Sequence, residues 1–328
     1  MLRVTPASSP PAVLRQPPIR IGTRASKLAQ TQSRMMQQRI AAALGASPGE
    51  EEAVAPLVLI TTSGDRIQDR RLLEAGGKGL FVKELEEALL DGRIDCAVHS
   101  MKDLPAELPP GLVVAAIPER EDPRDAFLGA GRFEALAQGA SLGTASLRRQ
   151  AQALYRRPDL DVVMVRGNVD TRIGKLRSGA FDGLVLALAG LKRLGLEQEA
   201  IEAFDPVEAP PAPGQGALAI ESREADAGAA WLAAIRHAPT ALAVAAERGA
   251  LQALEGSCRT AMGAHARVEA GQLLLTVEAL TPDGKARFRR QDQLGMLANQ
   301  ASEGAARALG LELGGAIREA AGDSIAWE

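Results

Sequence analysis

Residues 141–187 read SLGTASLRRQAQALYRRPDLDVVMVRGNVDTRIGKLRSGAFDGLVLA, and this stretch decides the fold class. Three apolar segments in it have the length of strands, at 141–143, 161–165 and 183–187. Two segments between them have helical spacing, at 146–156 and 169–178. Strands that alternate with helices form a parallel sheet whose faces the helices cover. The stretch therefore predicts an α/β domain.

The same alternation extends towards the N-terminus and predicts another α/β unit there. The expected strands are 19–22, 56–62, 94–99 and 112–117, and the expected helices are 80–91 and 26–44, the latter capped by Ser26. Residues 63–79 carry many charges, several glycines and little apolar periodicity, which is typical of a loop that acts as a lid. The charged run 119–125 predicts the connection between the two units.

The pattern changes towards the C-terminus. Residues 209–216 read APPAPGQG, which excludes regular structure and predicts a hinge, and 216–221 supplies one more strand. A helix at 240–255, strands at 262–269, 273–280 and 287–290, and a long Ala-rich helix predict a small α+β domain. We expect a disordered tail at 1–18, a first domain of 19–118 plus 214–236, a second of 119–213 and a third of 237–328.

Charge is distributed unevenly along the chain. The net charge is −3, yet residues 143–193 contain ten arginines and lysines against four aspartates. This segment either meets anionic ligands or pairs with acidic residues elsewhere. Proteins that bind single-stranded nucleic acid interleave basic residues with aromatic ones, and aromatic residues are only 3% of this chain. Small carboxylated or phosphorylated ligands therefore rank above nucleic acid, and we expect no nucleic-acid partner.

Other features narrow the class of protein. The longest apolar runs are much shorter than the roughly 20 residues that cross a bilayer, so no membrane span is expected. Cys96 and Cys258 are far apart and have no CxxC or Cys/His spacing, so we expect neither a disulfide framework nor a metal site. A reducing cytoplasm fits this cysteine usage best.

Lys102 and Asp103 directly follow an expected strand. In open α/β sheets, ligands bind outside the carboxyl ends of strands, so these two residues are candidates for a ligand site.

Six local strings resemble one family, in that family's order along the chain. They are GGKGLFVKELE (76–86), AVHSMKDLP (97–105), ASLRRQ (145–150), VRGNVDTR (165–172), LAGLKRLG (188–195) and PGQGALAIE (213–221). Together they resemble porphobilinogen deaminases, and six strings in order are far more specific than a lone motif. The resemblance implies two periplasmic-binding-protein-like α/β lobes around a cleft and an α+β C-terminal domain.

The resemblance also implies an activity. Such an enzyme condenses four porphobilinogen molecules head to tail, releases ammonia each time and hydrolyses off hydroxymethylbilane, in haem and porphyrin biosynthesis. It implies a dipyrromethane cofactor attached to Cys258 by a thioether, for which the thiolate is the nucleophile. It further implies a monomer. The family commonly has a second glycine where Ser257 stands here.

Asp103 and Lys102 match the catalytic positions of the family. A fixed carboxylate at Asp103 would stabilise the positive charge that develops on the pyrrole, and it could guide protons. Read without the resemblance, Asp103 is a turn residue before Pro105, and Lys102 is a solvated lysine at a strand edge. With it, Lys102 pairs with substrate carboxylates or tunes Asp103.

The resemblance assigns carboxylate binding to several cations and hydroxyls. Arginine suits this role because its planar fork binds a carboxylate through two hydrogen bonds and stays protonated. The matching residues are Arg24, Ser26, Lys78, Ser146, Arg148, Arg149, Arg166, Arg172 and Arg193. Arg193 could equally be an exposed charge at a helix end. The family often has a further lysine at the position of Glu74, which leaves open how many cations this loop supplies.

Two other functions remain open at this stage. A two-lobed solute-binding protein for an anionic ligand would show the same lobes, hinge and arginines, but it leaves Cys258 and the third domain unexplained. A nucleic-acid-binding module that uses residues 143–193 would lose affinity steeply with added salt.

Overall fold

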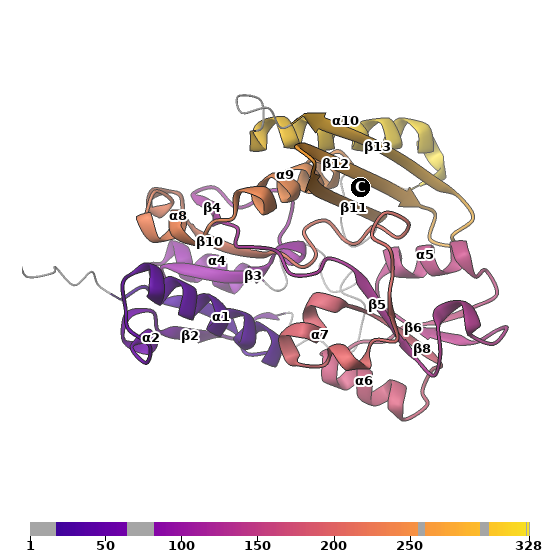
Figure 1. The fold of residues 1–328 in the computed structure, drawn as a ribbon, viewed down its shortest axis with the longest axis horizontal. Helices are drawn as coiled ribbons and strands as arrows, with labels where there is room; N and C mark the ends of the chain where they lie inside the picture. Colours follow the sequence, from indigo (N-terminus) through magenta and orange to yellow (C-terminus); the bar gives the residue numbers. More distant parts are fainter. Residues whose placement is uncertain (1–17, 64–81, 255–259, 296–301, 326, 328) are drawn as a thin grey trace, which may run out of the picture.

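The computed structural model describes residues 18–63, 82–254, 260–295, 302–325 and 327. The strands of this described part form two sheets of five strands and one sheet of three. Figure 1 shows the two larger sheets in neighbouring α/β lobes, with the three-stranded sheet and helix α10 lying across both. Cys258, Lys78 and Glu74 lie outside the described residues, as does most of the expected lid.

The first lobe is built on a mixed sheet in the order β2-β1-β3-β10-β4. Its strands are β1 Ile21–Arg24, β2 Leu57–Ile60, β3 Cys96–Ser100, β4 Leu112–Ala116 and β10 Leu218–Arg223. Its helices are α1 Lys27–Ala43, α2 Glu51–Val54, α4 Lys83–Leu90, α8 Ala230–Ile235 and the short 3-10 turns η1 Met101–Asp103 and η4 Glu224–Asp226. Strand β1 runs parallel to β2 and β3, whereas β10 is antiparallel to both β3 and β4.

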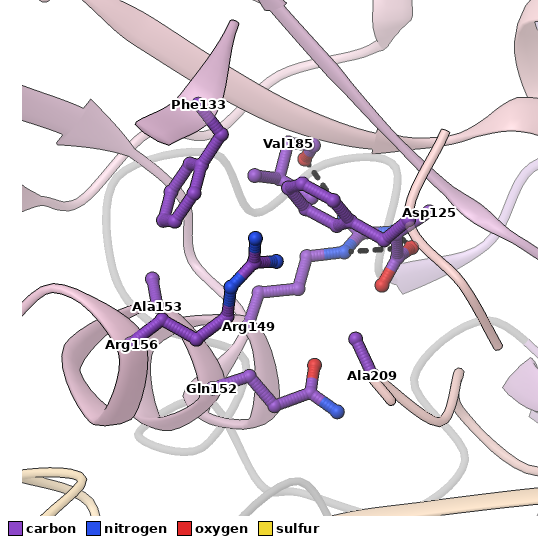
Figure 2. Close-up of a pocket in the computed structure, with 9 residues that line it drawn as sticks. Asp125, Phe133, Arg149, Gln152, Ala153, Arg156, Val185 and Ala209 are labelled. Atoms are coloured by element: carbon purple, nitrogen blue, oxygen red, sulfur yellow. Dashed lines mark hydrogen bonds and ion pairs between the residues drawn. The ribbon is translucent and has the colours of Figure 1, made fainter. Parts of the chain in front are cut away.

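The second lobe repeats this plan in the order β7-β6-β8-β5-β9. Its strands are β5 Asp125–Gly129, β6 Ser141–Gly143, β7 Asp161–Val163, β8 Gly183–Ala187 and β9 Glu202–Ala203. Its helices are α5 Leu147–Arg156, α6 Val169–Arg177, α7 Leu188–Leu194 and the 3-10 turns η2 Phe133–Ala135 and η3 Glu197–Glu199. Strand β5 is antiparallel to β8 and β9. Its first residue, Asp125, faces helix α5, where Arg149 lies (Figure 2).

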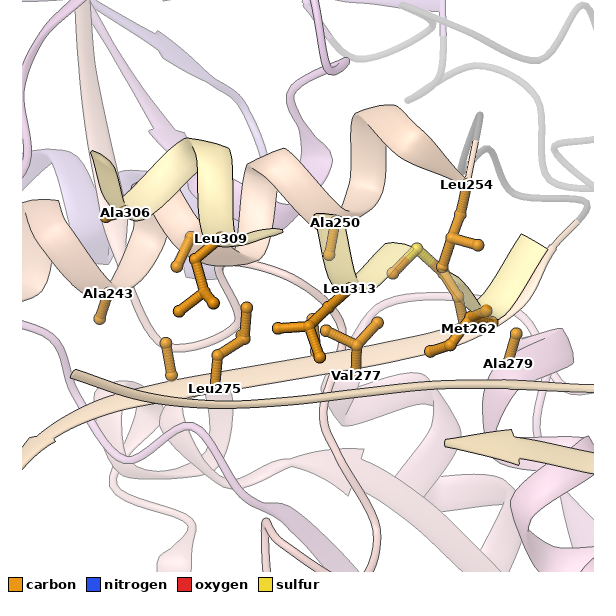
Figure 3. Packing of buried hydrophobic residues seen from close by; sticks show 14 of the residues in the cluster. Ala243, Ala250, Leu254, Met262, Leu275, Val277, Ala279, Ala306, Leu309 and Leu313 are labelled. Carbon is orange, nitrogen blue, oxygen red and sulfur yellow. The ribbon is translucent and has the colours of Figure 1, made fainter. Parts of the chain in front are cut away.

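The third domain packs two helices on one face of an antiparallel sheet. Its elements are α9 Ala238–Ala253, β11 Ala261–Glu269, β12 Gln272–Leu280, β13 Arg287–Gly295, α10 Glu303–Ala321 and the 3-10 turn η5 Gly322–Ser324. Its core is made of small and medium apolar side chains, among them Ala250, Leu275, Val277 and Leu313 (Figure 3). Leu254, at the end of α9, is fully buried in that core.

The expected α/β lobes and the α+β domain are confirmed, but the expectation of a purely parallel sheet is wrong. Strands β5 and β10 run antiparallel to their neighbours because they directly follow the two segments that cross between the lobes. The expectation that the connection extends through Asp125 is also wrong, since Asp125 begins β5. Among the described residues, no helix is long and apolar enough to cross a bilayer.

Helices α9 and α10 pack so closely that a single methyl group should separate them. A Cβ at Gly310 would lie 2.0 Å from the backbone oxygen of Ala246, whereas a Cβ at Gly315 on the same helix would meet nothing within 4 Å. We expect Gly310→Ala to destabilise the protein by about 1–3 kcal/mol, because the helix backbones must shift. Gly315→Ala should instead stabilise it by about 0.5–1 kcal/mol through helix propensity. Urea unfolding of both variants checks this contrast, and equal midpoints would contradict it.

Candidate active site

Lys102 and Asp103 lie at the carboxyl end of β3, in a turn that the surrounding structure fixes. Their neighbours Met101 and Leu104 are buried, while Lys102 and Asp103 themselves are exposed to solvent. Arg248 on helix α9 donates hydrogen bonds to the backbone oxygens of Pro105 at 2.7 Å and Ala106 at 3.0 Å. The third domain therefore holds the turn that presents the two candidate catalytic residues.

Arg24 and Ser26 lie at the carboxyl end of the neighbouring parallel strand, β1. Arg24 is the last residue of β1, and Ser26 caps α1 by accepting a hydrogen bond from the backbone N–H of Ala29 at 3.3 Å. Gln32 on α1 donates to the hydroxyl of Ser100 at 3.0 Å, which ties this helix to the end of β3. The first lobe thus brings Arg24, Ser26, Lys102 and Asp103 to one edge of its sheet, as ligand sites in α/β sheets require.

Helix and strand ends of the second lobe supply the next three residues. Ser146 caps α5, where its hydroxyl accepts from the backbone N–H of Arg149 at 3.4 Å. Arg172 donates from Nε to the oxygen of Gly167 at 2.8 Å. Burial and the charges of Arg149 and Arg166 lower the pKa of Arg172 to about 10. Among the described residues, the buried Nη1 of Arg166 has no hydrogen-bond partner.

An exposed ion pair connects the candidate binding edge of the first lobe with that of the second. Nζ of Lys27, the first residue of α1, lies 3.8 Å from a carboxylate oxygen of Asp170 on α6. Ser26 precedes Lys27 directly, and Arg172 follows Asp170 by two positions. The pair therefore places the Arg24–Ser26 end of the first lobe opposite the Arg166–Arg172 end of the second.

Arg148 and Arg149 share a single buried carboxylate, that of Asp125. Figure 2 shows Arg149 beside it. Arg148 Nη1 and Arg149 Nη2 each lie 2.7 Å from one of its oxygens. Arg148 Nη1 also donates to Gln152 at 2.8 Å and to the oxygen of Pro210 at 3.2 Å. Helix α5 thus aims both guanidinium groups into the protein, and the sequence does not predict this arrangement.

The cluster carries more positive than negative charge. Burial alone would raise the pKa of Asp125, but the charges of Arg148 and Arg149 outweigh burial and hold it well below its usual range. Burial and the charge of Arg149 nevertheless lower the pKa of Arg148, although the carboxylates of Asp125 and Glu278 act to raise it. Lys102 is open to solvent, yet protein atoms crowd its ammonium group, and lost hydration together with the charge of Arg149 lowers its pKa to about 8.

Arg193 reaches the hinge from helix α7. Its Nη2 donates to the oxygen of Gly216 at 2.6 Å, and its buried Nε has no hydrogen-bond partner among the described residues. Burial lowers its pKa to about 10. The alternative of an exposed charge at a helix end is therefore wrong for Arg193. The guanidinium group lies partly buried beside the segment that joins the lobes.

A small cavity behind Arg149 is not large enough to be the ligand site. Its volume is about 10 Å³, and the rings of Phe133 and Phe204 line it together with Asp125 and Arg156. That volume admits about one water molecule. This cavity is therefore too small to hold an organic ligand.

Sequence reasoning misses two buried residues of this arrangement, Asp125 and Gln215. Gln215 is 1% exposed and donates hydrogen bonds to Asp125 and to the oxygen of Pro123, both at 2.8 Å. The excess of cations in residues 143–193 signals that some of them pair with acids elsewhere, and Asp125 is such an acid. No signal in the hinge sequence singles out Gln215.

Taken together, the geometry is that of a two-lobed protein with an excess of positive charge near the ends of its strands. Its first lobe supplies exposed Lys102 and Asp103, and its second supplies arginines whose positive charge exceeds that of the acids around them. Such a surplus suits a ligand with several carboxylates.

Comparisons with known proteins identify the family. Residues 19–230 match the model of the porphobilinogen deaminase dipyromethane cofactor binding domain, and residues 241–319 match that of the porphobilinogen deaminase C-terminal domain. The porphobilinogen deaminase of Phenylobacterium zucineum strain HLK1 is 64% identical over 315 residues, which cover 94% of this chain and 98% of the relative. That of Caulobacter sp. strain K31 is 64% identical over 311 residues, with 94% and 98% covered. The chain belongs to the porphobilinogen deaminase family.

Family membership establishes the activity. The chain is a transferase with hydroxymethylbilane synthase activity, which joins four porphobilinogen molecules head to tail, releases ammonia and frees hydroxymethylbilane for tetrapyrrole biosynthesis. Its cofactor is dipyrromethane.

Among solved structures, the aliphatic sulphonate binding protein of Escherichia coli matches with TM-score 0.40 and 11% identity, covering 73% of this chain and 71% of that one. A putative methionine-binding lipoprotein of Bacillus subtilis matches with TM-score 0.39 and 13% identity, covering 66% and 88%.

Proposed function

We propose that the lobe junction, defined as the strand ends that carry Arg24, Lys102, Asp103, Ser146 and Arg166, holds the growing oligopyrrole during synthesis. Each pyrrole unit brings an acetate and a propionate, so the ligand gains negative charge with every addition. This proposal depends on one observation: the guanidinium groups of Arg148 and Arg149 share the single carboxylate of Asp125. Nη1 of Arg166 and Nε of Arg193, which find no acceptor in the described part of the chain, support it, because buried donors require acceptors.

The residues present fit a carboxylated cofactor. We assign its binding to the set that comprises Arg24, Ser26, Lys78, Ser146, Arg148, Arg149, Arg166, Arg172 and Arg193. Cys258 is the proposed attachment site. When bound, dipyrromethane supplies the pyrrole carbon to which the first porphobilinogen is joined.

Different members of this set act in different ways. Arg148 contributes charge and supports Arg149, since three protein oxygens already accept from its Nη1. The hydroxyls of Ser26 and Ser146 accept hydrogen bonds from helix N–H groups and can still donate to a carboxylate. The hydrogen bond from Nε of Arg172 to Gly167 fixes the direction of its guanidinium group.

Asp103 is the proposed catalytic group. Porphobilinogen loses its amino group as ammonia, which leaves positive charge on the pyrrole, and a carboxylate in fixed position stabilises that charge. The buried anchors Met101 and Leu104 and the hydrogen bonds from Arg248 prevent the turn from rearranging. Lys102 beside it binds a substrate carboxylate and thereby orients the substrate.

We further propose that the enzyme is a monomer in the cytoplasm, with domains at 19–118 plus 214–236, 119–213 and 237–328. The membership of β10 in the first sheet supports the return of the chain to the first domain. Light scattering coupled to size-exclusion chromatography tests the monomer.

Intact mass spectrometry tests the cofactor attachment. We expect purified enzyme to carry an adduct with the mass of a dipyrromethane and Cys258→Ala to lack both the adduct and activity. Cys96→Ala is the matched control, because Cys96 is fully buried in β3 and its thiol pKa is raised by burial, so it should keep adduct and activity. Active enzyme without an adduct would refute the attachment.

The charge of Lys102 predicts a pH dependence. A lysine is charged below its pKa, and burial and nearby arginines lower that of Lys102 to about 8. The value of kcat/KM, which reports groups of the free enzyme, should therefore fall as pH rises through about 8. Lys102→Arg keeps its charge throughout this range, so its profile should stay flat there even if its rate is lower. The same fall in both enzymes would exclude Lys102 as its origin.

A further inference from the structure

Gln215 lies where the two lobes and the hinge meet, and its hydrogen bonds fix the orientation of its amide. Its Nε2 donates to the oxygen of Pro123 and to Oδ1 of Asp125, each at 2.8 Å. Neither group can donate in return, so the NH2 end of the amide must face them. The carbonyl end, Oε1, then points in the opposite direction.

That carbonyl oxygen faces two cations. It accepts a hydrogen bond from Nζ of Lys102 at 3.1 Å, and Nη2 of Arg149 lies 3.5 Å away. Gln215 thus stands between Lys102 of the first lobe and Asp125 of the second. It presents its positive end to the carboxylate and its negative end to the ammonium group.

The backbone on either side of this amide is held firmly. Arg120 Nε donates to the oxygen of Gln215 at 2.7 Å, and the same guanidinium group makes two bonds to Glu247 of the third domain, at 2.7 and 3.0 Å. Glu247 also accepts from the backbone N–H of Gly214 at 2.6 Å. Gly216 has φ +87°, and a Cβ there would lie 2.3 Å from the oxygen of Glu121. All three parts of the molecule therefore fix the position of Gln215.

We infer that Gln215 is a positioning residue that holds the ammonium group of Lys102 in place beside Asp103 without neutralising it. This inference rests on the proposed role of Lys102. A neutral amide oxygen can orient an ammonium group through one hydrogen bond, whereas a carboxylate in its place would become a permanent counter-ion. Lys102 then keeps its charge for a carboxylate of the substrate, and Asp125 stays paired with Arg148 and Arg149.

The charged groups that face Lys102 come from three elements. Asp103 lies on the same turn, Asp125 begins β5, and Arg148 and Arg149 project from α5. The carboxylates raise the pKa of Lys102 and the guanidinium groups lower it. Gln215→Glu and Gln215→Met both remove the hydrogen bond from Gln215 to Asp125, so the difference between the two variants reports the added charge.

The test compares Gln215→Glu and Gln215→Met with Gln38→Glu, which adds the same charge at an exposed position on α1. Competitive acetylation of Lys102 with acetic anhydride, read by peptide mass spectrometry across pH 6–11, reports the ionisation of this lysine without requiring turnover. We expect Gln215→Glu to raise the midpoint by about one pH unit or more, because an opposite charge lies within contact distance. Gln215→Met should lower it, and Gln38→Glu should leave it unchanged.

Kinetics complete the test. Gln215→Glu should raise KM for porphobilinogen, because the new carboxylate competes for Lys102, and should shift the alkaline fall of kcat/KM upward. Gln215→Met should lower kcat, because Lys102 loses its anchor. Unchanged acetylation midpoints in both variants would overturn the inference and leave the proposed function standing. If the acetylation midpoints shift but kcat and KM stay at their wild-type values, Lys102 has no role in turnover. Gln215 would then not be a positioning residue either.

Discussion

Replacing Asp103 by asparagine should reduce the turnover of porphobilinogen by about two to three orders of magnitude while leaving the cofactor on the enzyme. Loss of one preorganised group that faces developing charge typically costs this much in rate. Asparagine keeps the shape of the side chain, and Asp103 is exposed, so the turn should survive the change. The measurement is single-turnover and steady-state release of ammonia, with intact mass to confirm the cofactor.

Two variants separate charge from shape at this position. Asp103→Glu restores the carboxylate but moves it, so its turnover should lie between those of Asp103→Asn and the parent enzyme. Asp91→Asn removes an exposed carboxylate at the end of α4 and should change nothing. Near-normal turnover in Asp103→Asn would remove Asp103 from its proposed role, and loss of the cofactor adduct would assign it to cofactor binding instead.

The sequence predicts those parts of the fold that depend on local patterns. The alternation of strands and helices, the cap at Ser26 and the irregular structure at 209–216 are confirmed, because spacing and capping residues determine them within a few positions. Strand β5 is not predicted, since it is short, begins with an aspartate and follows a charged run.

The candidate site likewise contains residues that the sequence predicts and residues that it does not. Lys102 and Asp103 can be found because they follow a strand directly, and strand ends carry ligand sites in α/β folds. The pairing of Arg148 and Arg149 with Asp125 cannot be found, because 23 and 24 residues separate the partners and only the sheet order brings them together. Gln215 is hidden for the same reason, since its partners come from both lobes.

Asp125 should be among the residues on which the stability of the fold depends most. Asp125→Asn removes the one carboxylate that two buried guanidinium groups share, and breaking a buried pair in this way costs about 3–5 kcal/mol. The cost is this large because Arg148 and Arg149 are 5% and 8% exposed and cannot turn to solvent without opening the lobe. Urea unfolding at pH 7 measures it.

The same carboxylate predicts how stability depends on acid. The folded-state pKa of Asp125 lies below its usual value, so its contribution is complete above the unfolded value near 4 and is lost as pH falls towards the folded value. The parent enzyme should therefore lose stability below about pH 4 more steeply than Asp125→Asn, which has no proton to gain at this position. Parallel stability curves for the two proteins in this range would show that another carboxylate is responsible.

A second substitution distinguishes lost charge balance from lost packing. Arg148→Met in the Asp125→Asn background removes one of the two uncompensated charges and leaves a side chain of similar length, so it should recover part of the lost stability. Asp159→Asn is the control nearer the surface, because the side chains of Asp159 and Arg157, at 26% and 16% exposed, are more accessible than that of Asp125, and its effect should be smaller. If the double variant is less stable than Asp125→Asn, the two guanidinium groups do not compete for one carboxylate, and the surplus of positive charge that attracts the oligopyrrole must be sought elsewhere.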